Sequence, residues 1–341
     1  MSLFFREKSK LGIDIGTSSI KVVQLKKEEE KQGHKLETFG VVNVANSFGR
    51  TDNFNAIEDT AEIVKALLKK SSVTAKDAVV SLPSGIVFVT MIEMPKLSEK
   101  ELKKAIEFEA RRYVPLPLEE VTMSWSVLET GSDGDQQKIL LTAVPTNVIE
   151  NYMKMLKAVN VKPEALEIEA LALIRSLVGD RKENVIIVDI GGRNTSLNLV
   201  ESGFLRVSRN LLVGGETITA SIAQGLKVSD ARAEQFKRDL GLTRELVQQI
   251  PQAMKPPLDR IKNETTQLLK IFESSGRTIA EIIFTGNGSK IPGLLKYFIE
   301  IGPKVSLGDP LKFINFSDSA KTAVEKNSLS LSVALGLAMR E

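Results

Sequence analysis

Residues 11–23, LGIDIGTSSIKVV, decide the fold of this chain, and a related stretch, VIIVDIGGRNTSLNLV, follows at 185–200. Each stretch reads as a buried strand, an Asp-x-Gly turn rich in hydroxyl or amide side chains, and a second strand. One such turn alone is typical of an ordinary β-hairpin. Two copies, each opening one half of a 341-residue chain, instead indicate an internal duplication in which the two turns act together.

The chemistry of the repeated turn suits a phosphate group. Glycine lacks a Cβ, so backbone N–H groups can approach phosphate oxygens, and Ser or Thr hydroxyls add donors. The aspartate at each strand end would repel phosphate, but it can accept hydrogen bonds from the waters of a bound Mg²⁺. Two facing copies would therefore hold a triphosphate from both sides. A third segment, EIIFTGNGSKIPGL at 281–294, places glycines between a strand and a helix, where backbone can lie against a base or ribose.

The composition excludes several classes of protein. Hydrophobic residues make up 42% of the chain and charged residues 26%, and no run approaches the ~18 apolar residues that a membrane span needs. Lys and Arg number 46 against 43 Asp and Glu, too even a balance for nucleic-acid binding. Cysteine is absent and the N-terminus lacks a signal-peptide pattern, which predicts a cytoplasmic protein. The single histidine, His34, lies in a polar segment that we interpret as a solvated turn.

Hydrophobic periodicity predicts an α/β organisation with an insertion. A strand meander over 10–45 is followed by a helix over 57–70 and a strand over 77–83. A compact βαββα unit then occupies 85–159, and Ser98 and Glu101 form a capping box for its first helix. The remaining predicted elements are a helix over 163–178, a second meander over 185–215, helices within 216–275 including a long one over 259–275, a strand over 281–288, a helix over 293–302, a strand near 305 and a closing helix over 328–339.

In this order and spacing, the three glycine-containing segments resemble the nucleotide site of the actin, Hsp70 and sugar kinase superfamily. The stretch 11–23 resembles the phosphate-1 motif, 185–200 the phosphate-2 motif and 281–294 the adenosine motif. EIEALALIRSL at 167–177 and SLSVALGLAM at 330–339 resemble the two connecting helices. Within the superfamily, the inserted βαββα unit resembles the extra subdomain of the cell-division protein FtsA and of the PilM family of type IV pilus assembly proteins.

Two longer strings are similar to the PilM family, namely KAIEFEARRYVPLPLEEVTMSWSVL at 104–128 and LVGGETITASIAQGLKVSDARAEQFKRDLG at 212–241. The resemblance covers essentially the whole chain and implies a two-lobed α/β fold of actin type. The implied subdomains are 1A (1–83, 163–182 and 327–341), the inserted 1C (84–162), 2A (183–215 and 277–326) and 2B (216–276).

Carried over motif by motif, the resemblance implies ATP and Mg²⁺ as cofactors. Asp14 and Asp189 would hold Mg²⁺ through water. Glu169 aligns with the actin position whose Gln positions the attacking water, where a carboxylate would be repelled by the triphosphate, so we expect at most slow hydrolysis. Lys21 would contact a phosphate, the alternative being a solvent-facing lysine on a strand. The other implied contacts are Gly16, Thr17, Ser18, Ser19, Gly191, Gly192, Asn194, Thr195, Gly214, Gly215, Glu216, Gly286, Asn287, Gly288 and Ser289.

Some positions depart from the family pattern or have two interpretations. Asn287 stands where the adenosine motif often has a second glycine, so backbone approach there would be looser. Glu234 and Lys237 lie at i and i+3 of a helix, where they could form an ordinary ion pair, whereas the resemblance directs them at the ribose and base. Trp125 replaces a residue that is often acidic in the family, and we interpret it as packing against one face of the insert sheet.

The resemblance implies an ATP-binding scaffold of the type IV pilus machine rather than mainly an enzyme. A groove between the insert and the first subdomain would bind the short cytoplasmic tail of a PilN-type membrane protein. Other pilus platform proteins and assembly ATPases are further expected partners, with no nucleic acid. The expected location is cytoplasmic, peripheral to the inner membrane through partners, and the sequence leaves self-association open.

Three alternatives belong to the same superfamily: an FtsA-like filament protein, a slow ATPase and a phosphotransferase. A sugar kinase would need a positioned carboxylate base and an acceptor pocket, and no segment supplies a recognisable one. FtsA carries an amphipathic helix beyond the last connecting helix, whereas this sequence stops at Glu341. We therefore expect membrane association to be indirect.

Overall fold

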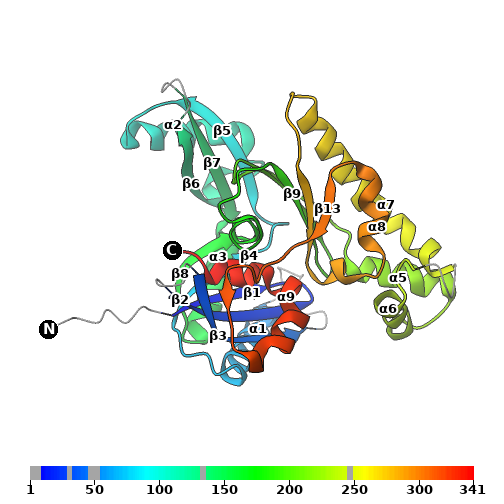
Figure 1. Cartoon of the computed structure of the whole chain (residues 1–341). Helices are drawn as coiled ribbons and strands as arrows, with labels where there is room; N and C mark the ends of the chain where they lie inside the picture. The colour runs from blue at the N-terminus through cyan, green and yellow to red at the C-terminus, as the bar shows by residue number, and fades with distance from the viewer. Residues whose placement is uncertain (1–8, 29–32, 45–53, 131–135, 244–248) are drawn as a thin grey trace.

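The computed structural model describes residues 9–28, 33–44, 54–130, 136–243 and 249–341. Two lobes, each built on its own β-sheet, lie side by side, and a smaller unit of three strands and a helix extends from the first lobe (Figure 1). Within the described residues, no helix is both long and apolar enough to cross a bilayer. The predicted two-lobed α/β architecture with an insertion is confirmed.

The first lobe is a six-stranded sheet in the order β14-β3-β2-β1-β4-β8. β1, β2 and β3 form the predicted antiparallel meander, whereas β4 and β8 run parallel to β1. Ile13 faces a core formed with helices α1 and α3, and Val23 on the opposite face packs under α9. The bounds are β1 (Lys10–Ile15), β2 (Ser19–Glu28), β3 (Gly33–Asn43), β4 (Asp77–Leu82), β8 (Lys162–Ile168), β14 (Ile314–Asn315), α1 (Phe54–Lys70), α3 (Thr146–Ala158) and α9 (Asp318–Ala338).

The second lobe repeats the central part of this sheet. Its order is β11-β10-β9-β12-β13, in which β9 and β10 form an antiparallel hairpin and β12 runs parallel to β9. Helices cover one face around Ile186 and Phe284, and the other face packs toward the first lobe through Ile187 and Ile283. The bounds are β9 (Val185–Ile190), β10 (Thr195–Glu201), β11 (Phe204–Leu211), β12 (Glu281–Thr285), β13 (Lys304–Leu307), α5 (Gly215–Leu226), α6 (Asp230–Asp239), α7 (Gln249–Glu273), α8 (Leu294–Phe298) and the short helices η4 (Asn287–Lys290) and η5 (Ile299–Ile301).

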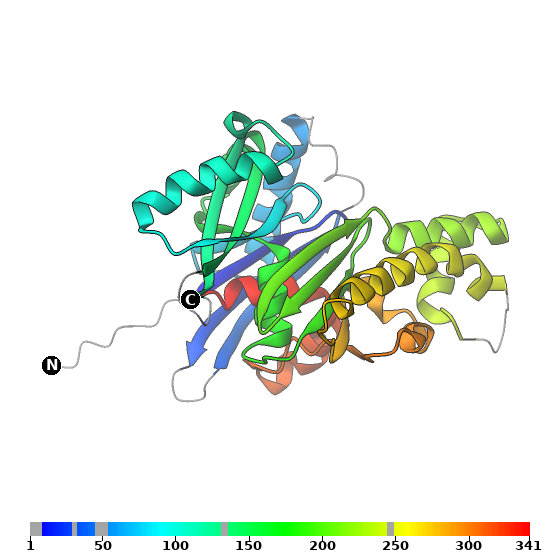
Figure 2. The same ribbon diagram turned by 90° about the horizontal axis from the view of Figure 1, so that it is seen from above.

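The insert has the predicted βαββα order, with the three strands arranged as β5-β7-β6 (Figure 2). α2 covers the sheet with Ile106 and Ala110, and the capping box of Ser98 and Glu101 is present at its start. Trp125 packs partly buried against this core, as predicted. Residues 131–135, between β6 and β7, lie outside the described residues. The bounds are β5 (Phe88–Pro95), α2 (Glu99–Tyr113), η2 (Leu118–Glu120), β6 (Val121–Thr130) and β7 (Gln136–Pro145).

The last helix of the insert, α3, packs away from the insert sheet. Its side chains Tyr152 and Leu156 enter the core of the first lobe beside Val64 of α1 and Ile13 of β1. The implied boundary at 162 assigns this helix to the insert, and that division of the chain stays a prediction.

Several predicted elements are wrong. Residues 163–168 form strand β8 rather than the start of a helix, because they pair in parallel with β4; the helix begins only at α4 (Glu169–Leu173) and continues as a π-helix, η3 (Ile174–Val178). α9 starts ten residues earlier than predicted. His34 is not in a solvated turn but on β3, with a buried Nδ1 and a pKa lowered by burial and by Lys27.

The long helix α7 starts ten residues before the predicted position and runs through Pro256 and Pro257. Proline has no N–H, so Pro257 leaves the carbonyl of residue 253 without its helical donor. The hydroxyl of Ser221 on α5 donates to Ala253 O at 2.6 Å and replaces that donor. A neighbouring helix therefore makes the internal proline tolerable.

Replacing Ser221 by Ala should lower the free energy of unfolding by about 1–2 kcal/mol, because Ala253 O would then lack a partner. Urea denaturation of Ser221→Ala measures this cost. Ser274→Ala is the matched control, since the Ser274 hydroxyl bonds only locally to Ile271 O at the exposed end of α7. Equal stability of the two variants would contradict the assignment.

Candidate functional site

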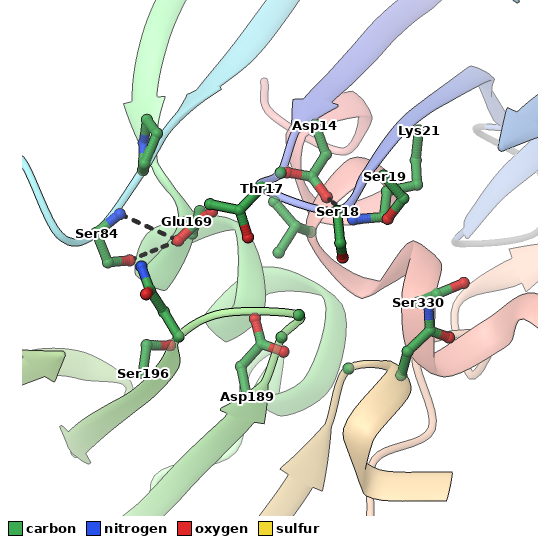
Figure 3. A pocket seen from close by; sticks show the side chains of 18 of the residues that line it. Asp14, Thr17, Ser18, Ser19, Lys21, Ser84, Glu169, Asp189, Ser196 and Ser330 are labelled. Carbon is green, nitrogen blue, oxygen red and sulfur yellow. Dashed lines mark hydrogen bonds and ion pairs between the residues drawn. The ribbon is translucent and has the colours of Figure 1, made fainter. Parts of the chain in front are cut away.

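A pocket lies between the lobes where the turn after β1 faces the turn after β9 (Figure 3). The same backbone hydrogen bond closes each turn, from Gly16 N to Ser19 O at 3.1 Å and from Gly191 N to Asn194 O at 2.9 Å. The internal duplication is therefore repeated in backbone geometry. The lining residues are Asp14, Ile15, Gly16, Thr17, Ser18, Ser19, Lys21, Pro83, Ser84, Glu169, Asp189, Gly191, Gly192, Asn194, Ser196, Asn210, Gly286, Asn287, Leu329, Ser330, Ser332 and Val333.

Asp14 is fixed at the end of β1 by two partners. Ser81 Oγ donates to its Oδ1 at 3.0 Å, and Lys21 Nζ, on the directly opposed residue of β2, donates to Oδ2 at 2.8 Å. Only 3% of Asp14 is exposed. Burial alone would lower the pKa of Lys21, but the hydrogen bond and charge of Asp14, with the charges of Asp189 and Glu169, raise it overall. Lys21 is therefore a largely buried cation in the cleft, with 12% of its side chain exposed, and not a solvent-facing lysine.

Asp189 stands at the end of β9 in the position that Asp14 has on β1. Burial raises the pKa of Asp189 to about 6; Lys21 opposes this rise and Asp14 adds to it. Gly286 packs directly on its carboxylate, since a Cβ at residue 286 would lie 2.2 Å from Asp189 Oδ1. Gly286 also has φ +80°, a conformation that favours glycine. The adenosine-type segment therefore reaches the cleft beside the second aspartate.

Glu169 is the first residue of α4 and points into the cleft (Figure 3). Both the backbone N–H and the hydroxyl of Ser84 donate to its Oε2, at 3.2 and 2.6 Å. Burial raises the pKa of Glu169 to about 7, the charge of Asp14 adds to the rise, and the Ser84 hydroxyl opposes it. The protonated form of this carboxyl is therefore favoured more than in an exposed glutamate.

The two turns approach each other closely. A Cβ on Gly192 would lie 2.2 Å from Ser18 Oγ, so only glycine allows this approach across the cleft. A Cβ on Gly214 would lie 2.5 Å from Gly192 O, which places the turn before α5 directly under the second loop.

The charges in the cleft fit a divalent cation. Three carboxylates, those of Asp14, Asp189 and Glu169, line the pocket, and Lys21 is the one cation among its described lining residues. A divalent ion would neutralise this excess of negative charge. No three Asp, Glu or His side chains of the described segments converge to bind a metal directly. An ion held here would therefore keep several of its own waters, as Mg²⁺ usually does.

Several residues implied by the resemblance do not line this pocket. Thr195 is fully buried and donates to Val213 O at 2.7 Å, and Gly288 packs against Ile190. Ser289 donates to Thr285 O. These three residues are packed inside the second lobe, so their part in ligand binding stays a prediction. The same holds for Gly214, Gly215 and Glu216. The carboxylate of Glu216 forms an ion pair with Arg193 at 3.1 Å.

Glu234 and Lys237 form an ion pair, which is one of the two arrangements considered from the sequence. Lys237 Nζ lies 2.5 Å from Glu234 Oε2. Lys237 Nζ also donates to Gly215 O at 3.0 Å and Thr219 Oγ1 at 2.8 Å. The pair therefore ties α6 to the glycine turn that starts α5. Contact with a ribose or base stays a prediction.

Sequence reasoning missed the polar residues that tertiary structure adds to the cleft, namely Ser84, Ser196, Asn210, Ser330 and Ser332. Ser330 and Ser332 belong to SLSLS at 328–332. Serines within an otherwise apolar helix are the local signal from which their place in the cleft could be predicted. Ser84 and Asn210 carry no such local signal, because they enter the cleft from connections to the insert and from β11.

The fold and the cleft define an actin-like protein: two lobes with duplicated central strands, paired aspartates at the cleft and an insertion in the first lobe. The family model described as type IV pilus assembly protein PilM matches residues 12–341. The chain belongs to this family.

Comparisons with individual proteins agree with this assignment. FtsA of Streptococcus pneumoniae is 24% identical over 258 residues, which cover 67% of this chain and 55% of FtsA, so the match spans little more than half of that relative. A chain of the PilM–PilN type IV pilus biogenesis complex superposes with a TM-score of 0.86 at 23% identity, covering 98% of both chains. MreB5 of Spiroplasma citri bound to AMPPNP gives a TM-score of 0.55 at 13% identity, covering 96% and 94%.

Proposed function

We propose that the chain is an ATP-binding scaffold of the type IV pilus assembly platform. One observation carries the nucleotide part: two facing Asp-x-Gly turns bring Asp14 and Asp189 into a single cleft, and β2 adds Lys21. The turn backbones and the hydroxyls of Thr17 and Ser18 would bind phosphates, and Lys21 would neutralise charge on them. The likeness to MreB5, whose structure contains AMPPNP, supports the proposal at the level of the fold.

Asp14 and Asp189 would hold Mg²⁺ through its waters in this proposal. The ion would supply charge neutralisation between the triphosphate and the two carboxylates. The protein's own contribution is to orient the Asp14 carboxylate, which Ser81 and Lys21 do through the hydrogen bonds described above.

The proposal is tested by titrating the protein with fluorescent mant-ATP in the presence of Mg²⁺. Asp14→Asn keeps the shape of the side chain but removes its charge, and it should weaken Mg²⁺-dependent binding about tenfold or more. Asp77→Asn, at the far end of β4, is the control. Absence of binding by the unaltered protein would overturn the nucleotide part of the proposal.

Lys21→Met should weaken mant-ATP binding by about 10- to 100-fold, because a charge-assisted hydrogen bond is worth about 1.5–3 kcal/mol. The variant also leaves Asp14 without its cation, so its fold must be verified by circular dichroism first. Lys65→Met on the exposed side of α1 should bind as the unaltered protein does. Unchanged affinity in Lys21→Met would mean that the lysine serves Asp14 alone.

The second part of the proposal concerns the insert. We propose that it binds the cytoplasmic tail of a PilN-type membrane protein, which would locate the chain at the inner membrane through its partner. The similar chain in the PilM–PilN complex supports this at the level of the fold. α2 exposes Phe108 (70%) close to Arg111 and Arg112, a combination suited to a short peptide with apolar and carbonyl groups.

A pull-down with a synthetic peptide of this tail tests the second part. Replacing both arginines by glutamate should abolish capture, while reversal of Lys65 and Lys69 on α1 should leave it intact. Failure of the unaltered protein to bind the peptide would overturn this part and leave the nucleotide part standing.

Slow ATP hydrolysis is a second candidate function, and the position of Glu169 favours it. Its carboxyl lines the cleft, and burial together with the charges of Asp14 and Asp189 raises its pKa to about 7. A group that titrates near pH 7 can accept a proton from water. Release of γ-labelled phosphate over hours, with Glu169→Ala as control, tests this activity.

A further inference from the structure

The chain enters and leaves the insert at one place beside the cleft. β4 of the first sheet leads into the crossing segment 83–87 and then into β5 of the insert. The chain returns through α3 to β8, which pairs with β4 as far as Leu82 and Ile168. The residues that follow this last rung, on the outgoing and the returning chain, therefore lie side by side.

Ser84 and Glu169 meet at this point. The N–H and the hydroxyl of Ser84 both donate to Glu169 Oε2, and Figure 3 shows the two bonds converging on this one oxygen from the outgoing segment. Charged groups face Glu169 from three strands, namely Asp14 from β1, Lys21 from β2 and Asp189 from β9. The buried, uncharged hydroxyl of Tyr152 faces it from α3. Ser84 is thus the hydrogen-bond donor that orients this carboxyl.

The crossing segment is also held against the second lobe. A Cβ on Gly85 would lie 3.0 Å from Asn210 Nδ2, so the segment packs on a residue that lines the cleft. Further along the same strand, Arg206 of β11 contacts Met91 and lies 3.7 Å from Glu93 of β5. Segment 83–87 and β5 therefore both contact β11 of the second lobe, and Ser84 lies within this connection.

We propose that Ser84 is a positioning residue that couples the insert to the nucleotide cleft: a peptide bound to the insert shifts segment 83–87 and thereby alters the placement of the Glu169 carboxyl. This inference rests on the proposed function, since it assumes a nucleotide in the cleft and a tail on the insert. If Ser84 had a purely structural role, its replacement would change the stability of the protein but not the effect of a peptide bound to the insert on nucleotide binding in the cleft.

The experiment measures mant-ATP affinity of the full chain with Mg²⁺ between pH 6 and 8.5, with and without a saturating synthetic peptide of the PilN-type tail. The peptide should change the affinity of the unaltered protein about fivefold or more, the lower range of measured couplings between sites. In Ser84→Ala this change should be lost. Without peptide, the midpoint of the pH dependence of mant-ATP affinity should also lie at higher pH in Ser84→Ala than in the unaltered protein. The reason is that the variant lacks a hydrogen-bond donor that favours the ionised carboxyl of Glu169.

Ser84→Thr keeps the hydroxyl, so the peptide should change its mant-ATP affinity as in the unaltered protein, and the pH midpoint of that affinity should not move. Ser274→Ala should also behave as the unaltered protein does in both measurements. If Ser84→Ala does not fold, Glu169→Gln takes its place and should abolish the peptide response. Retention of the full response in Ser84→Ala, or in Glu169→Gln, overturns the inference. So does a peptide that binds without changing nucleotide affinity. A protein that binds no nucleotide, or no peptide, overturns the proposed function as well.

Discussion

Glu169→Gln is expected to be more stable than the unaltered protein by about 3 kcal/mol above pH 7, without nucleotide or Mg²⁺. Burial raises the pKa of Glu169 from 4.5 to about 7, so the folded protein binds this proton more tightly than the unfolded chain does. The resulting stabilisation is complete below pH 4.5 and is lost as the pH rises through 7, at about 1.4 kcal/mol per pKa unit. Glutamine keeps the size and an acceptor for Ser84 but cannot ionise.

Urea denaturation at pH 5 and pH 8 measures this effect. The unaltered protein should lose stability between the two values, and Glu169→Gln should lose much less. Some dependence should remain in the variant, because burial also raises the pKa of Asp189 to about 6. Glu58→Gln on the exposed side of α1 is the control and should follow the unaltered protein. The same pH dependence in all three proteins would show that Glu169 is solvated.

The second large effect is expected from Gly336→Ala in α9. A Cβ there would lie 1.9 Å from Ala172 O and 2.5 Å from its carbonyl carbon, so the added methyl meets backbone, which cannot rotate away. The variant should lose about 3 kcal/mol or more of stability, at the upper end of overpacking costs. It should also strain the bond from Arg175 Nε to Gly336 O, which is 2.8 Å long.

Thermal and urea unfolding of Gly336→Ala, compared with Gly225→Ala, tests this packing. Gly225 also lies within a helix, but its added methyl would meet only the Cβ of Ala253 at 3.1 Å. Alanine is the better helix former by about 1 kcal/mol, and this gain offsets the cost of the tight contact with Ala253. The free energy of unfolding of Gly225→Ala should therefore be nearly unchanged. Equal stability of the two variants would mean that α4 and α9 can separate at little cost.

The parts of the fold that the sequence predicts are those encoded locally. The turns after Asp14 and Asp189 combine glycine, hydroxyl side chains and flanking apolar strands within a dozen residues, and both occur where predicted. Residues 163–168 show the opposite case. Their apolar spacing also suits a helix, and only pairing with β4, some 80 residues away, makes them a strand. α7 likewise depends on Ser221 of another helix to run through its prolines.

The candidate site divides in the same way. Asp14, Lys21 and Asp189 belong to the repeated motif, and the pocket contains all three. Ser84 and Asn210 come from segments without a motif and are brought to the cleft by the insert and by β11. Thr195 was assigned to the ligand because it lies within the motif. Its hydroxyl donates to Val213 O inside the second lobe, and contact with a ligand stays a prediction.

The strand order of the first sheet has a consequence for biosynthesis. β14 at residues 314–315 completes the edge beside β3, and α9 covers the face of β1 and β2, whereas the second sheet uses only residues 185–307. At about 5–20 residues per second, a ribosome needs on the order of tens of seconds to pass from β3 to α9. The first strands made are therefore the last to be covered. During that interval their apolar face is open to a chaperone or to aggregation, while the second lobe can already form its sheet.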